Sequence, residues 1–407
     1  NCRTRHVVAL VVALDCRTRA HVAMFHFGVE IEALKPRTPP MLFDAGARAP
    51  IIPALQAHMQ RLPGKARLLR ADGADVLSEE DPETGLPWEP TPTAVRYFTY
   101  KDSKADTDFN AWKITTDASI RGDHGEGVGG LEFITPKLPY RRSAIEALRH
   151  FVAGIGIGGY VANDTTAVHV HVSCQHLSNQ QIKRFATYLV AMEPLIDLYL
   201  SPKRREDNNR YVRSNLQSVS ETRSWFDAVR RIEAVDVSSS IDPLVDLLNV
   251  KLAPVEHSER NHKVNFTLLR GTRVGDARRR VEFRQHQGTT DPHAVCDWTE
   301  FCVRFVRATA AQKESPLQAV ERSGRTDCYD NAVASLPLAL LWRLVDDEVL
   351  EERFAWYRKA ADGMPDVGAV ESREIVALRD DAYDDMGDID AVLGASTDQR
   401  ADAGSEG

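Results

Sequence analysis

The sequence predicts an α+β fold that is built on a largely antiparallel sheet. Several short segments alternate apolar and polar residues with a period of two, which is typical of strands with one buried face and one polar face. Segments with helical periodicity lie between these strands at irregular intervals. A doubly wound parallel sheet would show a regular alternation of strand and helix, so the antiparallel arrangement is favoured.

The expected elements follow in chain order. Strands are expected at residues 23–34, 94–100, 112–115, 131–134, 167–173, 264–270 and 280–286. Helices are expected near 52–61, from Ser143 to about 152, after Ser178, from Asp291-Pro292 to about 311, and over about 336–361. Ser178 and Gln181 have the spacing of a capping box, and Pro292 suits the first turn of a helix.

Chain length predicts one large or two medium domains, and we assign one main domain with flanking segments. We expect residues 1–22 to be a disordered segment outside the fold and residues 23–315 to be the main domain. Residues 316–362 are expected to form a C-terminal helical extension, and residues 363–407 an acidic, disordered tail. The long polar and Pro-rich stretch 35–92 interrupts the main domain.

The net charge of −8 comes from the tail, which carries 12 Asp and Glu against 3 Arg. The rest of the chain is nearly neutral, so there is no electrostatic reason to expect nucleic acid binding. The basic clusters Lys203-Arg204-Arg205 and Arg278-Arg279-Arg280 are interpreted as solvated surface, with phosphate contact as the less favoured alternative.

Cysteine usage and hydropathy predict an intracellular, cytoplasmic protein. The six cysteines are scattered, and no CxxC pair occurs among them. This pattern fits neither a disulfide framework nor a zinc knuckle. No stretch reaches the roughly 18–20 apolar residues that a membrane span needs, so no membrane partner is expected.

The candidate chemistry lies on the predicted strands. Glu30 and Glu32 lie two residues apart in Phe27-Gly28-Val29-Glu30-Ile31-Glu32, so both point to the same side of a strand. Comparable groups occur at alternate or single positions of three other predicted strands: Glu132, the pair His169 and His171, and the pair Glu282 and Arg284. Four such strands side by side would aim these groups into one cavity, where they suit divalent cations and a polyphosphate.

Alternatives remain open for each segment. An HxH pair also occurs in zinc hydrolases, and Glu282 with Arg284 could be an isolated ion pair. The runs 125–130 and 154–159 match GxGxxG, but the first precedes a strand and the second follows a predicted helix, so both are interpreted as turns. Neither GxxxxGK[ST] nor GxSxG occurs, which excludes a P-loop and a nucleophile elbow.

Taken in order, these segments resemble the amidoligase family, a branch of the glutamine synthetase and glutamate-cysteine ligase superfamily of carboxylate-amine ligases. The resemblance covers about residues 25–310. The matching segments are Gly28-Val29-Glu30-Ile31-Glu32, Trp112 with Asp117-Ala118-Ser119, Gly130-Leu131-Glu132-Phe133-Ile134-Thr135-Pro136, His169-Val170-His171-Val172, Arg210-Tyr211, Val264-Asn265-Phe266, and Val281-Glu282-Phe283-Arg284-Gln285-His286-Gln287-Gly288-Thr289. It implies an antiparallel sheet that lines a funnel-like active site flanked by helices, as in the glutamine synthetase catalytic domain, with two or three Mg²⁺ or Mn²⁺ ions.

The resemblance also implies roles for individual residues. Glu32 and Glu132 would hold one ion, and Glu30, His169 and Glu282 would hold another. Arg284 would touch the transferred phosphate, and His171 would lie near the nucleotide; with Glu282, these two are the expected catalytic residues. The remaining expected nucleotide- or substrate-binding residues are Asp117, Arg210, Tyr211 and Asn265. Glutamine synthetase has a further acidic ligand near the counterpart of Glu132, for which Glu126 and Asp117 are the candidates here.

The implied function is an ATP-dependent carboxylate-amine ligase that works through an acyl phosphate. ATP and Mg²⁺ or Mn²⁺ are the expected cofactors, and small-molecule or peptide carboxylates and amines are the expected substrates. Two alternatives are a zinc hydrolase that uses His169 and His171, and an inactive binding module with the same fold. Binding of ATP with Mg²⁺ discriminates the ligase from the zinc hydrolase.

Overall fold

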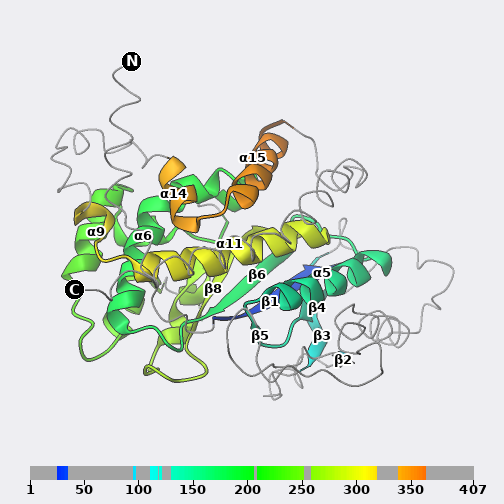
Figure 1. The fold of residues 1–407 in the computed structure, drawn as a ribbon, viewed down its shortest axis with the longest axis horizontal. Coiled ribbons are helices and arrows are strands. Elements are labelled where there is room, and N and C mark those ends of the chain that lie inside the picture. Colours follow the sequence, from blue (N-terminus) through cyan, green and yellow to red (C-terminus); the bar gives the residue numbers. More distant parts are fainter. Residues whose placement is uncertain are drawn as a thin grey trace, which may run out of the picture. The chain divides into compact units, whose positions relative to one another are not determined.

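A computed structural model describes residues 25–34, 95–97, 111–117, 119–121, 130–205, 209–251, 258–318 and 338–363 (Figure 1). The expectations for residues 1–22, for the helical patch at 52–61, for most of the glycine run at 125–130 and for the tail beyond residue 363 lie outside this part of the chain. The predicted domain boundaries stay predictions.

The described strands form one open, mostly antiparallel sheet. The strands are β1 (His26–Ala33), β2 (Val95–Tyr97), β3 (Trp112–Asp117), β4 (Gly130–Ile134), β5 (Leu138–Pro139), β6 (Ala167–Ser173), β7 (Val264–Asn265) and β8 (Arg280–Gln287). Their order is β2-β3-β4-β1-β6-β8-β7, with β5 also paired to β1, and β2 with β3 is the parallel pair. The predicted α+β class with a largely antiparallel sheet is confirmed, whereas the likeness to the glutamine synthetase funnel stays a prediction.

Helices pack against one face of this sheet. The helices are α5 (Arg142–Ile157), α6 (Asn179–Asp197), α7 (Pro202–Arg205), α8 (Asn215–Val219), α9 (Trp225–Ala234), α10 (Asp242–Leu248), α11 (Pro292–Ala311), α14 (Leu338–Val345) and α15 (Glu348–Gly363), with 3₁₀ turns η2 (Ser258–Arg260) and η3 (Thr267–Leu269). Figure 1 shows α11 and α5 side by side across the sheet, and α11 also contacts α6, α14 and β6.

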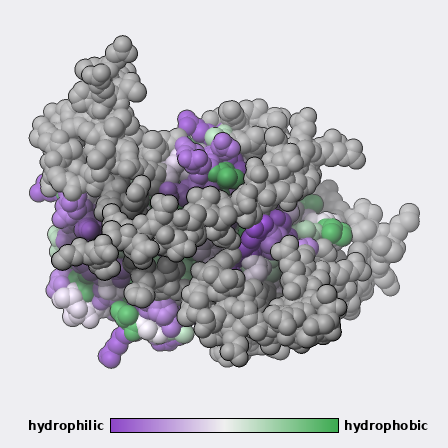
Figure 2. Space-filling model, in the orientation of Figure 1, coloured by the Kyte–Doolittle hydropathy of each residue, from purple (hydrophilic) through white to green (hydrophobic). Residues whose placement is uncertain are grey.

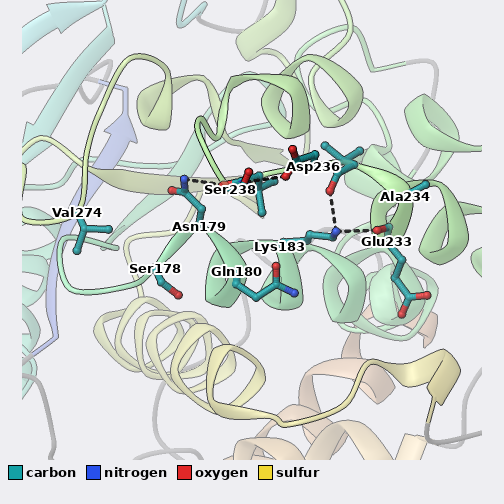
Figure 3. A pocket seen from close by; sticks show the side chains of 11 residues that line it. Ser178, Asn179, Gln180, Lys183, Glu233, Ala234, Asp236, Ser238 and Val274 are labelled. Carbon is teal, nitrogen blue, oxygen red and sulfur yellow. Dashed lines mark hydrogen bonds between the residues drawn. The ribbon is translucent and has the colours of Figure 1, made fainter.

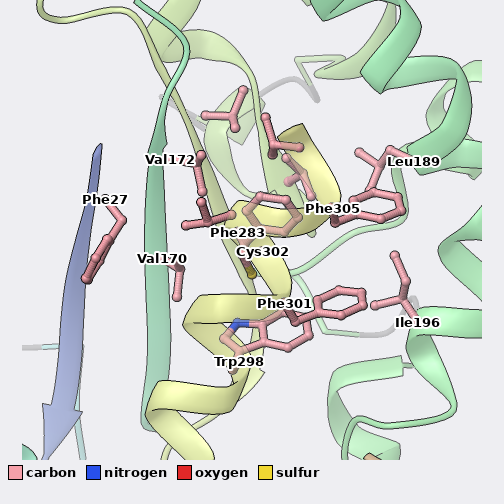
Figure 4. Close-up of a cluster of buried hydrophobic side chains, with 14 of the residues drawn as sticks. Phe27, Val170, Val172, Leu189, Ile196, Phe283, Trp298, Phe301, Cys302 and Phe305 are labelled. Atoms are coloured by element: carbon pink, nitrogen blue, oxygen red, sulfur yellow. The ribbon is translucent and has the colours of Figure 1, made fainter. Parts of the chain in front are cut away.

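The hydrophobic core lies between the strands and α11. Val170 and Val172 on β6 and Phe283 on β8 are fully buried and face the Trp298 and Phe301 rings of α11 (Figure 4). Period-two alternation puts the residues between them on the opposite face. Burial of the apolar face therefore fixes which side chains of β6 and β8 point toward the polar face.

The two C-terminal helices dock on α11 through an aromatic cluster. Trp342 of α14 and Phe354 of α15 both contact Tyr199, and the Trp342 indole donates a hydrogen bond of 2.9 Å to its hydroxyl. Arg353 donates to one oxygen of Asp297 on α11, at 2.7 Å. Both helices therefore add to the main core.

Several predicted helix ends are confirmed. Ser178 accepts a hydrogen bond from the Gln181 backbone, and the Gln181 side chain accepts one from the Ser178 backbone, which completes the capping box of α6. Asp291 accepts from the backbone of His293 at the start of α11, with Pro292 in the first turn.

Three predicted elements need correction. Ser143 does not cap α5, because the helix begins one residue earlier, after an extended Arg141; the helix also continues to Ile157, through Gly154 and Gly156 of the second glycine run. The expected strand 264–270 is a two-residue strand followed by a 3₁₀ turn. The expected helix 336–361 is two helices, since Asp346 between them adopts a positive φ of 53° that an α-helix cannot contain.

The described surface carries only scattered apolar groups. Large exposed hydrophobic side chains are Ile157, Val161, Tyr211, Val250 and Val274. Figure 2 shows hydrophobic residues as small, separate areas among hydrophilic ones on the face in view. Within the described residues, every helix is too short or too polar to cross a bilayer.

Candidate functional site

The four strands that carry the candidate groups lie next to one another in the order β4-β1-β6-β8. The register pairs Glu30 with His169, and Glu32 with Glu132. It also pairs His171 with Glu282. Directly paired residues of antiparallel strands project from the same face, so all these side chains share one side of the sheet. We call this side the acidic face.

Glu30 is the centre of the first group on the acidic face. Its two carboxylate oxygens lie 2.9 Å from Nε2 of His171 and 3.3 Å from Nδ1 of His169. The same His169 nitrogen lies 3.7 Å from an oxygen of Glu282. Ligand atoms of Glu30, His171 and Glu282 all lie within 4.8 Å of one another, as do those of Glu30, Glu132 and His169.

A second group consists of carboxylates alone. Ligand atoms of Glu32, Asp117 and Glu132 lie within 4.8 Å of one another. Asp117 is the last residue of β3 and accepts a hydrogen bond from the Ser119 backbone at 2.7 Å. Asp117 is therefore the described candidate for the additional acidic ligand, whereas Glu126 lies outside the described residues.

Glu282 is held by two neighbours on the acidic face. Arg284 donates through Nη1 to one of its oxygens at 2.5 Å, and Asn265 of β7 donates to the other at 2.8 Å. Burial acts to raise the pKa of Glu282, but the charges of Arg284, His171 and His169 outweigh it and lower that pKa to about 2. Glu282 is therefore ionised across the usual pH range.

The histidines act in the same way on Glu30. Burial acts to raise its pKa, but the charge of His171 and hydrogen bonds from both histidines hold it well below the usual value. In turn, burial acts to lower the pKa of His171, and the charges of Glu30 and Glu282 raise it. The anionic forms of Glu30 and Glu282 and the protonated form of His171 thus favour one another.

Glu132 shows the opposite behaviour. Burial and then the negative charges of Glu30, Glu32 and Asp117 raise its pKa well above the usual value. Burial also raises the pKa of Glu32, and the charge of His169 opposes the rise. The second group therefore carries negative charge that no basic residue within the group balances. Bound divalent cations would offset this excess.

The donor set on the acidic face fits hard divalent cations. Carboxylate oxygens predominate, with one or two imidazole nitrogens, and oxygen ligands are those that Mg²⁺ and Mn²⁺ prefer. Glu32, Asp117 and Glu132 could hold one ion, and Glu30 with His169 or His171 and Glu282 could hold another.

Two of the residues named from the sequence have their described polar contacts elsewhere. Arg210 and Tyr211 are exposed, and Arg210 donates to the Tyr211 hydroxyl at 2.6 Å and stacks over its ring. The Tyr211 backbone donates to Asn209. Among the described residues, none of these contacts reaches the acidic face, so their substrate-binding role stays a prediction.

Two cationic residues near the site were not identified from the sequence. Lys113 is only 6% exposed, and it shares a face of β3 with Thr115, which pairs with Glu132. The alternation in Trp112–Asp117 was the signal that could have identified it. Arg204 is 7% exposed, so the interpretation of Lys203-Arg204-Arg205 as solvated surface is wrong for its middle residue.

A separate pocket of about 700 Å³ lies beside the N-terminal end of α6 (Figure 3). Its Lys183 donates two hydrogen bonds of 2.7 Å to the carbonyls of Glu233 and Val235, at the C-terminal end of α9. Asn179 donates to the Val237 carbonyl. These polar groups join α6 to the segment after α9, and this role is structural.

The fold and the acidic face define an α+β protein with a polyacidic site on an antiparallel sheet. The chain belongs to the amidoligase family: the family model described as "Putative amidoligase enzyme" matches residues 23–306. This range contains β1 to β8 and most of α11. No curated protein matches the chain. The family assignment indicates a ligase that acts on small-molecule or peptide substrates.

Proposed function

We propose that this protein is an ATP-dependent carboxylate-amine ligase that forms an amide or peptide bond through an acyl phosphate. The observation that carries the proposal is the convergence of five carboxylates, two imidazoles and Arg284 on one sheet face. Phosphoryl transfer requires positioning and charge neutralisation more than covalent help from the protein.

The proposed reaction has two steps. A carboxylate oxygen of the first substrate attacks the γ-phosphorus of ATP, and the bond from that phosphorus to the β–γ bridging oxygen breaks to release ADP. The nitrogen of the amine then attacks the acyl carbon and loses a proton. The bond from that carbon to the phosphate oxygen breaks, which leaves the amide and inorganic phosphate.

Each group on the acidic face has a proposed task. Mg²⁺ or Mn²⁺ would supply positive charge to the β- and γ-phosphate oxygens. Glu30, Glu32, Glu132, His169 and Glu282 would hold the ions. Arg284 would contact the transferred phosphoryl group, since its guanidinium fork matches two phosphate oxygens. Asn265 keeps Glu282 oriented through its hydrogen bond, and His171 would lie near the nucleotide.

The zinc hydrolase alternative is less well supported. His169 and His171 both make their close contacts with Glu30, and five carboxylates crowd the same face. A zinc site needs only one such carboxylate and leaves Arg284 without a task. Divalent metals with oxygen preference suit this donor set better.

The direct test combines ATP and Mg²⁺ or Mn²⁺ with pools of amino acids and peptides. ADP release and new amide masses are measured together, because a ligase makes both in equal amounts. Glu30→Gln should abolish both products, whereas Glu146→Gln on α5, which packs against the other face, should not. Metal-dependent hydrolysis without ATP consumption would favour the zinc enzyme, and ATP binding without turnover would favour the inactive module.

A further inference from the structure

Arg204 is a buried cation at the edge of the acidic face. It lies in the four-residue helix α7, between exposed Lys203 and half-buried Arg205. Its Nη2 donates a hydrogen bond of 2.9 Å to the carbonyl of Thr166, which directly precedes β6. The same carbonyl accepts from Gly288, just after β8. The guanidinium is therefore anchored where β6 begins and β8 ends.

The charge of Arg204 acts on residues of the acidic face. It opposes the rise in the Glu32 pKa that burial causes. Together with burial, it lowers the pKa of His286 on β8 to about 4. It also interacts with Arg284, a like charge. Arg204 thus belongs electrostatically to the end of the site that holds Glu32 and Arg284.

Unlike the interior cations Lys263 and Arg353, Arg204 has no ion-paired carboxylate among the described residues. Lys263 lies 2.6 Å from Asp197, and Arg353 lies 2.7 Å from Asp297. Within the described residues, Arg204 has no carboxylate oxygen within 4.0 Å. Burial, with the charge of Arg284, lowers its pKa to about 10 although Glu32 opposes the shift. A buried charge without a counter-ion is costly, and proteins usually pair it.

Arg284 also has a guanidinium N–H donor that, within the described part of the chain, is free to bind an anion. Its Nη1 donates to Glu282, but its Nε is buried and has no acceptor among the residues that the structure describes. Two guanidinium groups that act on each other inside a protein repel each other, and an anion close to both offsets this repulsion. A planar oxyanion or a phosphoryl group can accept from both forks.

We propose that Arg204 and Arg284 together form an oxyanion-binding subsite, which receives a phosphoryl or carboxylate group of a substrate. This subsite would be part of the proposed ligase site, and its assignment rests on the ligase function only for the identity of the substrate. The shared chemistry is an anionic group with two or three equivalent oxygens. A nucleotide phosphate and an acid substrate are its two possible sources.

The test is direct binding of simple anions to the full-length protein. Inorganic phosphate and acetate are titrated by calorimetry at constant ionic strength and without nucleotide. Wild type is compared with Arg204→Gln, Arg204→Lys and the matched control Lys203→Gln, which removes a charge from the adjacent exposed position. Near-UV circular dichroism verifies that each variant is folded, and the Lys variant serves if the Gln variant does not fold.

We expect phosphate affinity to fall at least tenfold in Arg204→Gln and by a smaller factor in Arg204→Lys, with Lys203→Gln unchanged. Loss of phosphate affinity indicates a phosphoryl source, and loss of acetate affinity alone indicates a carboxylate source. Equal affinities in wild type and Arg204→Gln, an equal loss in Lys203→Gln, or no anion binding by wild type would overturn the proposal. Failure of the ligase function would appear separately, as Arg204-dependent anion binding without ATP turnover.

Discussion

Glu132→Gln is expected to stabilise the metal-free protein and to weaken its response to Mg²⁺ or Mn²⁺. The Glu132 carboxylate lies within 4.8 Å of Glu32 and Asp117, and burial with these negative charges raises its pKa. Gln has nearly the same shape but no charge, so it removes repulsion without opening a hole. The same change removes one oxygen donor from the proposed cation site.

The magnitude follows from the spacing. Two unit charges at 4.8 Å repel by about 3 kcal/mol at an effective dielectric constant of roughly 20. The raised pKa of Glu132 favours protonation, which relieves part of this repulsion, so we expect a gain of about 1–3 kcal/mol in the free energy of unfolding. Each kcal/mol shifts the melting temperature by about 2–4 °C in a protein of some 150–250 residues, and this chain should respond no more strongly. A cation at 100 times its dissociation constant would add about 2.7 kcal/mol to wild type alone.

Differential scanning calorimetry at one pH, first with EDTA and then with MgCl₂ or MnCl₂, measures both effects. Glu146→Gln is the matched control, because Glu146 pairs with Arg149 on α5, away from the acidic face. A Glu132→Gln protein that melts below wild type in EDTA would refute the repulsion argument. An equal metal-induced rise in both proteins would refute the assignment of Glu132 as a ligand.

Three further predictions concern the site, a buried histidine and a helix cap. Arg284→Lys should lose about 2–4 kcal/mol of transition-state stabilisation with little change in ATP affinity. Glu282→Gln should instead raise the Mg²⁺ concentration needed for ATP turnover. Equal turnover in Arg284→Lys and wild type would contradict the phosphate role of Arg284. Burial, with the charge of Arg213, lowers the pKa of His262 to about 4. As pH falls from about 6.5 to 4, the unfolded chain binds a proton that the folded protein does not, so the protein loses up to about 3 kcal/mol of stability. Urea unfolding of His262→Gln should show a smaller loss of stability between pH 7 and pH 5 than wild type, and identical losses would count against the shift. Ser178→Ala should cost about 1 kcal/mol in urea unfolding, since it removes the capping box of α6, and an unchanged midpoint would speak against that role.

Period-two alternation made the acidic face predictable from sequence. Because side chains alternate strictly along a strand, Glu30 and Glu32 had to share a face, and so did His169 and His171. Alternation within one strand says nothing about its neighbours, however. We expected these strands to share one site because the same alternation recurs on four of them, and the family resemblance supported this. The register that pairs Glu30 with His169 and Glu32 with Glu132 is a tertiary fact.

Helix boundaries were predictable where a local signal sets them and missed where packing sets them. Ser178 and Asp291 carry their caps in the adjacent sequence, and both were identified. The break at Asp346 was not, since nearly continuous helical periodicity surrounds it. Packing of α14 and α15 on opposite sides of this break places Trp342 and Phe354 against the same Tyr199 ring.

Arg204 shows why a run of like charges is a poor guide to any one of its members. Three basic residues in a row indicate a solvated surface, yet only Lys203 is exposed, Arg205 is half-buried and Arg204 is buried. Arg204 bonds to Thr166, 38 positions earlier, and its charge acts on Arg284, 80 positions later, and the strands that carry these two residues meet only when β6 and β8 pair. A buried cation so placed has an energetic need for an anion that the sequence alone does not reveal. The acidic face has cation ligands at its centre, and the guanidinium groups of Arg204 and Arg284 act on the end that holds Glu32. A bound oxyanion would interact favourably with both, which connects the fold to the proposed chemistry.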